Sequence, residues 1–301
     1  MIDYVKLRFL ANFPPEILDR RKTIVEFQGQ EYYPKFSASG EVHHYSRDVD
    51  NLKKKLQPYD GSVQIENSLH KFFHGHNYND FFLSEVESSI NRLASICSLN
   101  PQNTIIKGLE YGCNVVVKDV HNVLNGLVSN RNKAYQPMVW NGLKYGVTCQ
   151  FGQYSIKAYN KTQEAKIHYK VAIPENTLRW EIRIKKMPAL HKRSQQIPIF
   201  HLQDLAEYEK VQYLAEDILM KFRSSVKRST SFRYSELSTH QLGVIGAMQN
   251  EDVINALKTM RKSSYRSYTS EYKKLLKNAV PFWEGELEVL LGEKCRELLN
   301  G

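Results

Sequence analysis

The sequence contains few cysteines and no long apolar run. Its four cysteines, Cys97, Cys113, Cys149 and Cys295, are scattered without CxxC spacing, which argues against a zinc site and suits a reducing cytoplasm. No apolar stretch approaches the ~18 residues of a membrane span. The Met1-Ile-Asp start has no basic region followed by an apolar one, so it does not resemble a signal peptide. We therefore expect a cytoplasmic protein with no membrane partner.

The chain carries an excess of positive charge. It has 301 residues, a formal net charge of +10 and a pI near 9.2. A hydrophobic fraction of 42% is enough for a real core, which excludes a disordered protein. The basic balance favours a polyanionic partner, although charge alone does not identify nucleic acid.

Two segments late in the first 200 residues alternate with period two, which is typical of half-buried strands. The first covers 154–161 and the second 178–186. The polar face of the first carries Lys157, Tyr159 and Lys161. The polar face of the second carries Arg179, Glu181, Arg183 and Lys185. If the two strands are neighbours, they form one floor that combines a tyrosine, a carboxylate and several cations.

Residues upstream offer candidate metal ligands. We expect 62–73 to be one strand, with Glu66, Ser68 and His70 on the same face. A polar turn over 74–80 follows and contains His76. In an expected strand over 103–117, Glu110 lies between Gly108 and Gly112, which leaves room beside the carboxylate. His43 and His44 are adjacent on a predicted strand and should face opposite sides, so we interpret them as surface residues.

The remaining periodicity predicts an α+β protein. Residues 1–200 should form a mainly antiparallel central sheet with flanking helices, and 201–301 an all-helical, basic domain. The expected strands include 2–10, 137–149 and 152–161, with 178–186 closing the sheet, and 162–175 should be a loop. The expected helices are 85–98, with Ser84 as N-cap, 118–129, 203–224, one after 238, 251–260, 264–279 and 283–299.

These residue types match one kind of chemistry. A tyrosine can attack a phosphodiester if its hydroxyl is activated, and a divalent metal held by carboxylate and imidazole can polarise the phosphate. Mixed Glu/His ligation suits Mg²⁺ or Mn²⁺ better than structural zinc. We expect Tyr159, Lys161 and Glu181 to be catalytic. The expected metal ligands are Glu66, His70, His76 and Glu110.

The C-terminal part is expected to contact DNA. Between 220 and 279 there are twelve Lys/Arg against four Asp/Glu, and three tyrosines at helical spacing follow residue 264. Basic side chains contact phosphates and tyrosines stack on unpaired bases. The candidate DNA-binding residues are Lys157, Arg179, Arg183, Arg261, Lys262, Arg266, Lys273 and Lys274. A merely solvated basic surface is the alternative.

Six segments carry a resemblance to a known family. They are the Met1-Ile-Asp start with an alternating strand after it, Gly75-His-Asn77 with a following helix, Ile106-Lys-Gly-Leu-Glu110, Ala158-Tyr-Asn-Lys161, Leu178-Arg-Trp-Glu-Ile-Arg-Ile-Lys185 and Leu202-Gln-Asp-Leu205. In order and rough spacing, over about residues 1–205, the chain resembles the replication initiators of filamentous phages and related plasmids, which are rolling-circle nickases of the HUH endonuclease class. The pair formed by Tyr-x-Lys and Arg-x-Glu-x-Arg is the most specific part of the match.

The resemblance implies a function and partners. Tyr159 would be the nucleophile of an origin-specific DNA nickase and strand transferase that forms a 5′-phosphotyrosine, and Glu110 and His76 would match metal positions. The implied partners are origin DNA, single-stranded or hairpin, and a host helicase or polymerase in a bacterial cytoplasm. The chain departs from the class in having His74-Gly-His76 where two histidines flank a bulky residue.

Three alternatives stay open. Tyr169 is a fallback nucleophile. A second alternative is a non-catalytic DNA-binding or regulatory relative of such nickases, which would need no metal. A relaxase or transposase using the same chemistry is the third, and only its substrate would distinguish it.

Overall fold

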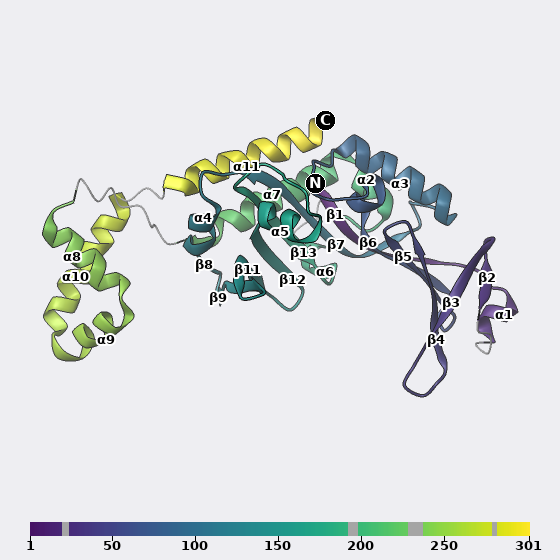
Figure 1. The fold of residues 1–301 in the computed structure, drawn as a ribbon, viewed down its shortest axis with the longest axis horizontal. Helices are drawn as coiled ribbons and strands as arrows, with labels where there is room; N and C mark the ends of the chain where they lie inside the picture. Colours follow the sequence, from purple (N-terminus) through teal and green to yellow (C-terminus); the bar gives the residue numbers. More distant parts are fainter. Residues whose placement is uncertain (20–23, 192–197, 228–236, 279–281) are drawn as a thin grey trace.

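An eleven-stranded antiparallel sheet forms the centre of the protein (Figure 1). The computed structural model describes residues 1–19, 24–191, 198–227, 237–278 and 282–301. The strand order is β10-β11-β12-β13-β7-β1-β6-β5-β4-β3-β2. The strands are β1 (Ile2–Leu10), β2 (Val25–Phe27), β3 (Gln30–Phe36), β4 (Val42–Val49), β5 (Leu52–Gln57), β6 (Ser62–Ser68), β7 (Ile105–Val116), β10 (Gln136–Trp140), β11 (Leu143–Gln150), β12 (Tyr154–Asn160) and β13 (Thr177–Ile184).

Helices and a second, small sheet complete the fold. The small sheet contains β14 (Ser225–Lys227), β8 (Leu127–Asn130) and β9 (Lys133–Ala134) in that order. The helices are α1 (Pro15–Leu18), α2 (Leu69–His74), α3 (Leu83–Cys97), α4 (Val120–Gly126), α5 (Lys161–His168), α6 (Pro188–His191), the 3-10 helix η1 (Leu202–Ala206), α7 (Tyr208–Arg223), α8 (Thr239–Gln249), α9 (Glu251–Met260), α10 (Lys262–Asn278) and α11 (Phe282–Asn300). The predicted α+β class is confirmed.

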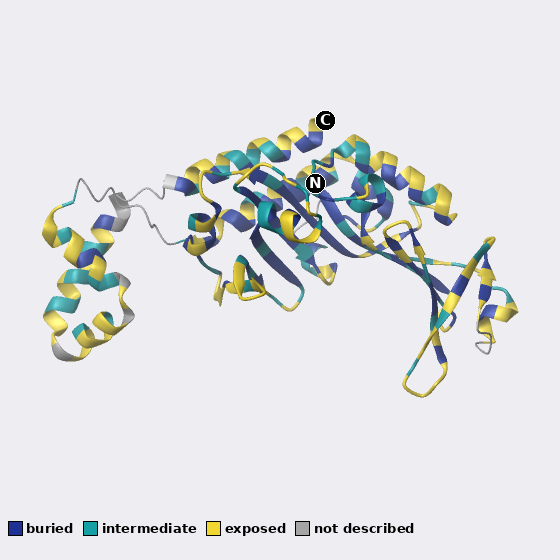
Figure 2. Ribbon diagram, in the orientation of Figure 1, coloured by how far each residue is buried: buried dark blue, intermediate teal, exposed yellow. Residues whose placement is uncertain are grey.

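The apolar face of the central strands is buried under two helices from the C-terminal part of the chain, α7 and α11 (Figure 2). On β13 the apolar positions Trp180 and Ile182 are fully buried, and the Trp180 ring meets Phe222 of α7 edge to face at 5.3 Å. Helices α7 and α11 pack on each other and on β7. Burying this face fixes the opposite side of the same strands as the polar one, because side chains alternate along a strand.

Several local predictions were wrong at element boundaries. The strand expected over 62–73 ends at Ser68, whose side chain accepts from the backbone of Lys71 and caps α2, so His70 lies on a helix. The loop expected over 162–175 begins as α5, capped by Asn160. The strand expected to close the sheet, β13, instead lies between β12 and β7.

Two smaller predictions also fail. Helix α3 begins at Leu83, before the expected cap Ser84, because Glu85 accepts a hydrogen bond from the backbone of Phe82. The rings of His43 and His44 do not point apart; their Nδ1 atoms are 2.9 Å apart. The pairing of β3 with β4 shifts register beside them, which breaks the strict alternation of sides.

Helices α8, α9 and α10 form a unit with its own small core. Val244, Ile245 and Leu275 are its buried residues, and Tyr268 and Tyr272 pack against them. Those two tyrosines are therefore used in packing, which the sequence-based prediction of base stacking did not anticipate. The unit stands apart from the sheet in Figure 1. The predicted division of the chain at residue 200 stays a prediction.

The chain segments on either side of this unit meet. Lys227 at the end of β14 places its Nζ 2.6 Å from Oε1 of Glu284 near the start of α11. Within the described residues, no helix is both long and apolar enough to cross a membrane. The four cysteines are free and buried.

Candidate functional site

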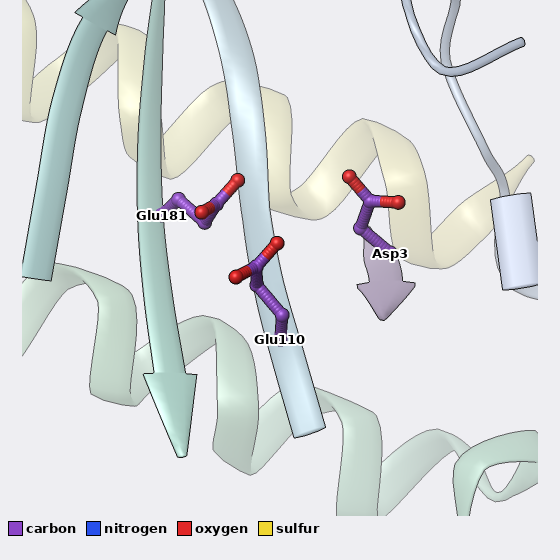
Figure 3. Close-up of side chains that lie close together, drawn as sticks. All are labelled: Asp3, Glu110 and Glu181. Atoms are coloured by element: carbon purple, nitrogen blue, oxygen red, sulfur yellow. The ribbon is translucent and has the colours of Figure 1, made fainter. Parts of the chain in front are cut away.

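Three carboxylates converge on the polar face of the sheet. Asp3, Glu110 and Glu181 each offer an oxygen within 4.8 Å of the other two. They come from the neighbouring strands β1, β7 and β13 and point toward one another, while α7 and α11 lie behind the strands (Figure 3). All three are buried. A cluster of buried carboxylates is unfavourable unless cations neutralise it.

Two cations are built into the cluster. Lys157 places Nζ 3.0 Å from Glu110 and 2.6 Å from Glu181. Arg179 lies 2.9 Å from Glu181 and 3.0 Å from Asp3. A third cation at the edge of the cluster, the partly exposed Arg183, lies 3.8 Å from Glu110. Three cations therefore face the three carboxylates.

The carboxylates differ in how readily they ionise. Burial, together with the neighbouring Glu181, raises the pKa of Glu110 to about 8. Burial also opposes ionisation of Glu181, but Lys157 and Arg179 outweigh it and lower that pKa. The pKa of Asp3 is likewise lowered, because Arg179 outweighs the effect of burial. A cation bound beside Glu110 would favour the ionised form of this carboxyl group.

Tyr159 lies next to this cluster. Its hydroxyl donates to Oε2 of Glu181 at 3.3 Å, and it is 8% exposed. Burial, reinforced by Glu181, raises the pKa of the phenol. Gly146 lies opposite Tyr159 on β11, where a Cβ would come within 2.5 Å of the Tyr159 Cβ. Only glycine therefore lets β11 approach Tyr159 this closely.

Lys161, predicted to act beside Tyr159, lies in a second hydrogen-bond network. Its Nζ donates to Oδ1 of Asn77 at 3.1 Å and pairs with Glu164 at 2.6 Å. The Tyr169 hydroxyl also donates to Asn77 at 3.1 Å, and Asn77 in turn donates to Asp3 at 3.0 Å. Burial, with Arg179 nearby, lowers the pKa of Lys161. Tyr169, the fallback nucleophile, is thus connected to the carboxylate cluster only indirectly, through hydrogen bonds that run by way of Asn77.

The predicted metal ligands are not brought together as a set. Glu110 is in the carboxylate cluster. Glu66 lies on β6 and pairs with Lys55 and, at 3.9 Å, with Lys6. His70 is buried on α2 with Nε2 2.8 Å from Asn79, and the ring of His76 stacks on Tyr78 at 3.9 Å.

The predicted DNA-binding cations fall into two groups. Lys157 and Arg179 are occupied by the cluster carboxylates, as described above. Arg183 is 41% exposed and lies over the ring of Tyr4 at 4.7 Å. Arg261, Lys262, Arg266, Lys273 and Lys274 all lie in the helical unit and are exposed.

Sequence reasoning missed Asp3 and Asn77. Period two places Asp3 on the same side as Val5 and Leu7, which are buried apolar residues. The register of β1 against β7 shifts between Ile2 and Val5, and such an irregularity lets Asp3 face the carboxylates instead. The only sequence signal was an acidic residue at the start of a strand. Asn77 lies in the segment Gly75-His-Asn77, but its residue type alone does not predict a role at the site.

Comparisons with known proteins add little. No protein-family model matches the chain, and no curated protein matches it. A similar solved structure is that of a rolling circle replication initiator protein from Geobacillus stearothermophilus, with 15% sequence identity and a TM-score of 0.40. The similarity covers 84% of this chain and 95% of that chain. This similarity is too remote to indicate the function of this chain.

Proposed function

We propose that the protein is a rolling-circle replication initiator that nicks one DNA strand at an origin. The observation that carries the proposal is the Tyr159 hydroxyl 3.3 Å from Glu181, within a cluster that also contains Asp3 and Glu110. A phenol beside a group of carboxylates able to hold a divalent cation is the arrangement that tyrosine-mediated strand transfer requires.

In the proposed reaction the Tyr159 oxygen attacks the scissile phosphorus. A bond forms between that oxygen and phosphorus, the bond from phosphorus to the 3′ oxygen breaks, and the proton of the phenol passes to Glu181. The products are a 5′-phosphotyrosine and a strand that ends in a 3′-hydroxyl once its oxygen is protonated. Attack of a 3′-hydroxyl on the phosphotyrosine reverses the step and rejoins DNA.

The donor set fits a hard divalent cation. Carboxylate oxygens are the ligands that Mg²⁺ and Mn²⁺ prefer, and Asp3, Glu110 and Glu181 would hold the ion. A bound ion would polarise the scissile phosphate and lower the cost of forming a phenolate. This cost matters because burial raises the pKa of Tyr159. Lys157 and Arg179 keep Glu181 ionised, so its Oε2 can accept the hydrogen bond of the phenol.

The exposed basic residues of α10 and its start, from Arg261 to Lys274, support a duplex- or hairpin-contacting role for the helical unit. We propose that this unit holds the origin while the sheet cuts it. A host helicase and polymerase in a bacterial cytoplasm would then extend the 3′-hydroxyl.

The test is covalent capture. The protein is incubated with Mn²⁺ and single-stranded oligonucleotides that tile the replicon encoding it, and adducts are resolved on denaturing gels. Mass spectrometry of the adduct should place the nucleotide on Tyr159. Tyr159→Phe should abolish the adduct and Tyr169→Phe should retain it. An adduct that forms at the wild-type rate in Tyr159→Phe would refute the assignment.

The alternative is a non-catalytic DNA-binding or regulatory protein. The observation that favours it is that the phenol of Tyr159 is buried, with 8% of the residue exposed, and is hydrogen-bonded to the carboxylate of Glu181. Origin binding without any metal-dependent adduct would establish this alternative. A relaxase or transposase would instead form the adduct on a transfer-origin or transposon-end substrate.

A further inference from the structure

A row of side chains that are paired in register crosses the polar face of the sheet away from Tyr159. Arg8 pairs in register with Gln64, Gln64 with Lys55, Lys55 with Ser46, and Ser46 with Tyr33. Directly paired residues on neighbouring antiparallel strands project to the same side of the sheet. These five residues, here called the cross-strand row, therefore share one face across β1, β6, β5, β4 and β3.

The cross-strand row lies on the same face as the carboxylate cluster. Lys6, two residues before Arg8, pairs in register with Gly108, two residues before Glu110. Arg183, paired with Glu110, lies over the ring of Tyr4 on β1. Tyr4 and Lys6 alternate with Val5, which is fully buried on the apolar side. The polar face is thus continuous from the site to β3.

The charge on this part of the face is positive. The cations are Lys6, Arg8, Lys35, Lys53, Lys55 and Arg183, and the carboxylates are Glu31, Asp48, Asp60, Glu66 and Glu110. Glu66 is shared between Lys6 and Lys55, and Asp60 lies 2.8 Å from Arg8. Six cations against five carboxylates leave a net excess of one. The side chains of Lys6 and Arg8 are 41% and 38% exposed, and Tyr33 at the end of the row is 52% exposed.

We infer that the cross-strand row binds the single-stranded flank of the DNA whose scissile phosphate lies at Tyr159. Alternating cations and an exposed aromatic ring are the features of single-strand tracks, where cations contact phosphates and rings stack on bases. Four inter-strand steps of ~4.8 Å give a length of about 19 Å, room for several nucleotides. A single strand is favoured over a duplex because the buried phenol can be reached only by an unpaired, flexible chain. The inference rests on the proposed function for its choice of DNA.

The test measures binding without cleavage. Proteins that carry Tyr159→Phe are titrated, in EDTA, with fluorescein-labelled single-stranded DNA of about 40 nucleotides and with the corresponding duplex, over a range of salt concentrations. Arg8→Gln/Lys55→Gln should reduce the salt-dependence slope for the single strand by about 1.4, which is two contacts at about 0.7 each. Tyr33→Ala should weaken binding at least about fivefold with the slope unchanged, because stacking releases no counterions.

The matched control removes two cations from α7 and α11, the helices that cover the opposite face of the sheet. Arg223→Gln/Arg296→Gln changes exposed residues of α7 and α11 and should leave the slope for the single strand unchanged. The inference is overturned if Arg8→Gln/Lys55→Gln behaves like this control, or if it weakens duplex binding to the same extent. Adduct formation is assayed separately in Tyr159-containing protein. If no adduct forms but Arg8→Gln/Lys55→Gln still reduces the salt-dependence slope, the nickase mechanism is rejected and the binding surface is retained.

Discussion

The Tyr159 hydroxyl and Arg179 bind the same oxygen, Oε2 of Glu181, at 3.3 Å and 2.9 Å. The phenol therefore shares its proton acceptor with a guanidinium on the neighbouring strand. This sharing keeps Glu181 ionised while it holds the phenol in one orientation. Orientation and charge at the nucleophile depend on the same buried carboxylate.

Glu181→Gln is expected to reduce both stability and reaction rate. Removing the carboxylate leaves Lys157 with Glu110 and Arg179 with Asp3 as their remaining partners, so the loss should be about 3 kcal/mol, at the low end for breaking a buried pair. Urea unfolding measures it. Glu66→Gln, which breaks partly exposed pairs, should cost about 1 kcal/mol or less. Equal losses in the two variants would contradict a buried network at Glu181.

Metal binding should separate two possible ligand sets. Calorimetric titration of Mn²⁺ should show affinity weakened at least about tenfold in Asp3→Asn and Glu110→Gln. Glu66→Gln and His76→Gln should bind Mn²⁺ like the wild type, because the structure places both residues outside the carboxylate cluster. Weakened binding in Glu66→Gln and His76→Gln, with wild-type binding in Asp3→Asn, would instead support the ligand set predicted from the sequence.

Gly112→Ala should disrupt the pairing of β7 with β13. A Cβ at this position would lie 2.2 Å from the backbone oxygen of Trp180, so the strands must separate beside Glu181. We expect a loss of at least about 2 kcal/mol together with loss of adduct formation. Gly152→Ala, with nothing within 4 Å of the added Cβ, is the matched control. A wild-type melting curve for Gly112→Ala would show that this register is wrong.

His70 should make the protein sensitive to acid. Burial lowers its pKa to about 3, whereas in the unfolded chain it is about 6.5. Between these values the unfolded chain binds a proton that the folded chain does not, so stability falls as the pH falls. From pH 7 to pH 5 the loss is about 2 kcal/mol. Unfolding of His70→Gln should lack this increment, while the exposed His121→Gln keeps it. If both variants lose stability equally with acid, His70 is not the source.

The basic residues of the helical unit should govern duplex binding. Arg261→Gln/Lys262→Gln/Arg266→Gln should reduce the salt-dependence slope for origin duplex by about 2.7, which is three contacts at about 0.9 each. Adduct formation on single-stranded oligonucleotides should be unchanged. An unaltered slope, matching the Arg223→Gln/Arg296→Gln control, would mean that this surface is only solvated.

The sequence predicted the strands better than the site. Alternation identified β12 and β13 because their apolar positions are buried and their polar positions share one face, and it placed Glu181 and Tyr159 together. It could not place Asp3, because an irregularity in β1 reverses the side that period two assigns. It misplaced His70, because a capping serine ends the strand two residues earlier. Convergence of Asp3, Glu110 and Glu181 depends on the sheet order, which no local pattern encodes.

The Lys227 to Glu284 contact has a consequence for how the helical unit is attached. The end of β14 and the start of α11 lie side by side, so α8, α9 and α10 form an insertion between these two elements. A short flexible linker joining 227 to 282 should leave the central sheet and its covering helices folded, with α11 still packed on α7. The sheet with its carboxylate cluster and the unit of α8, α9 and α10 can then be altered independently of each other.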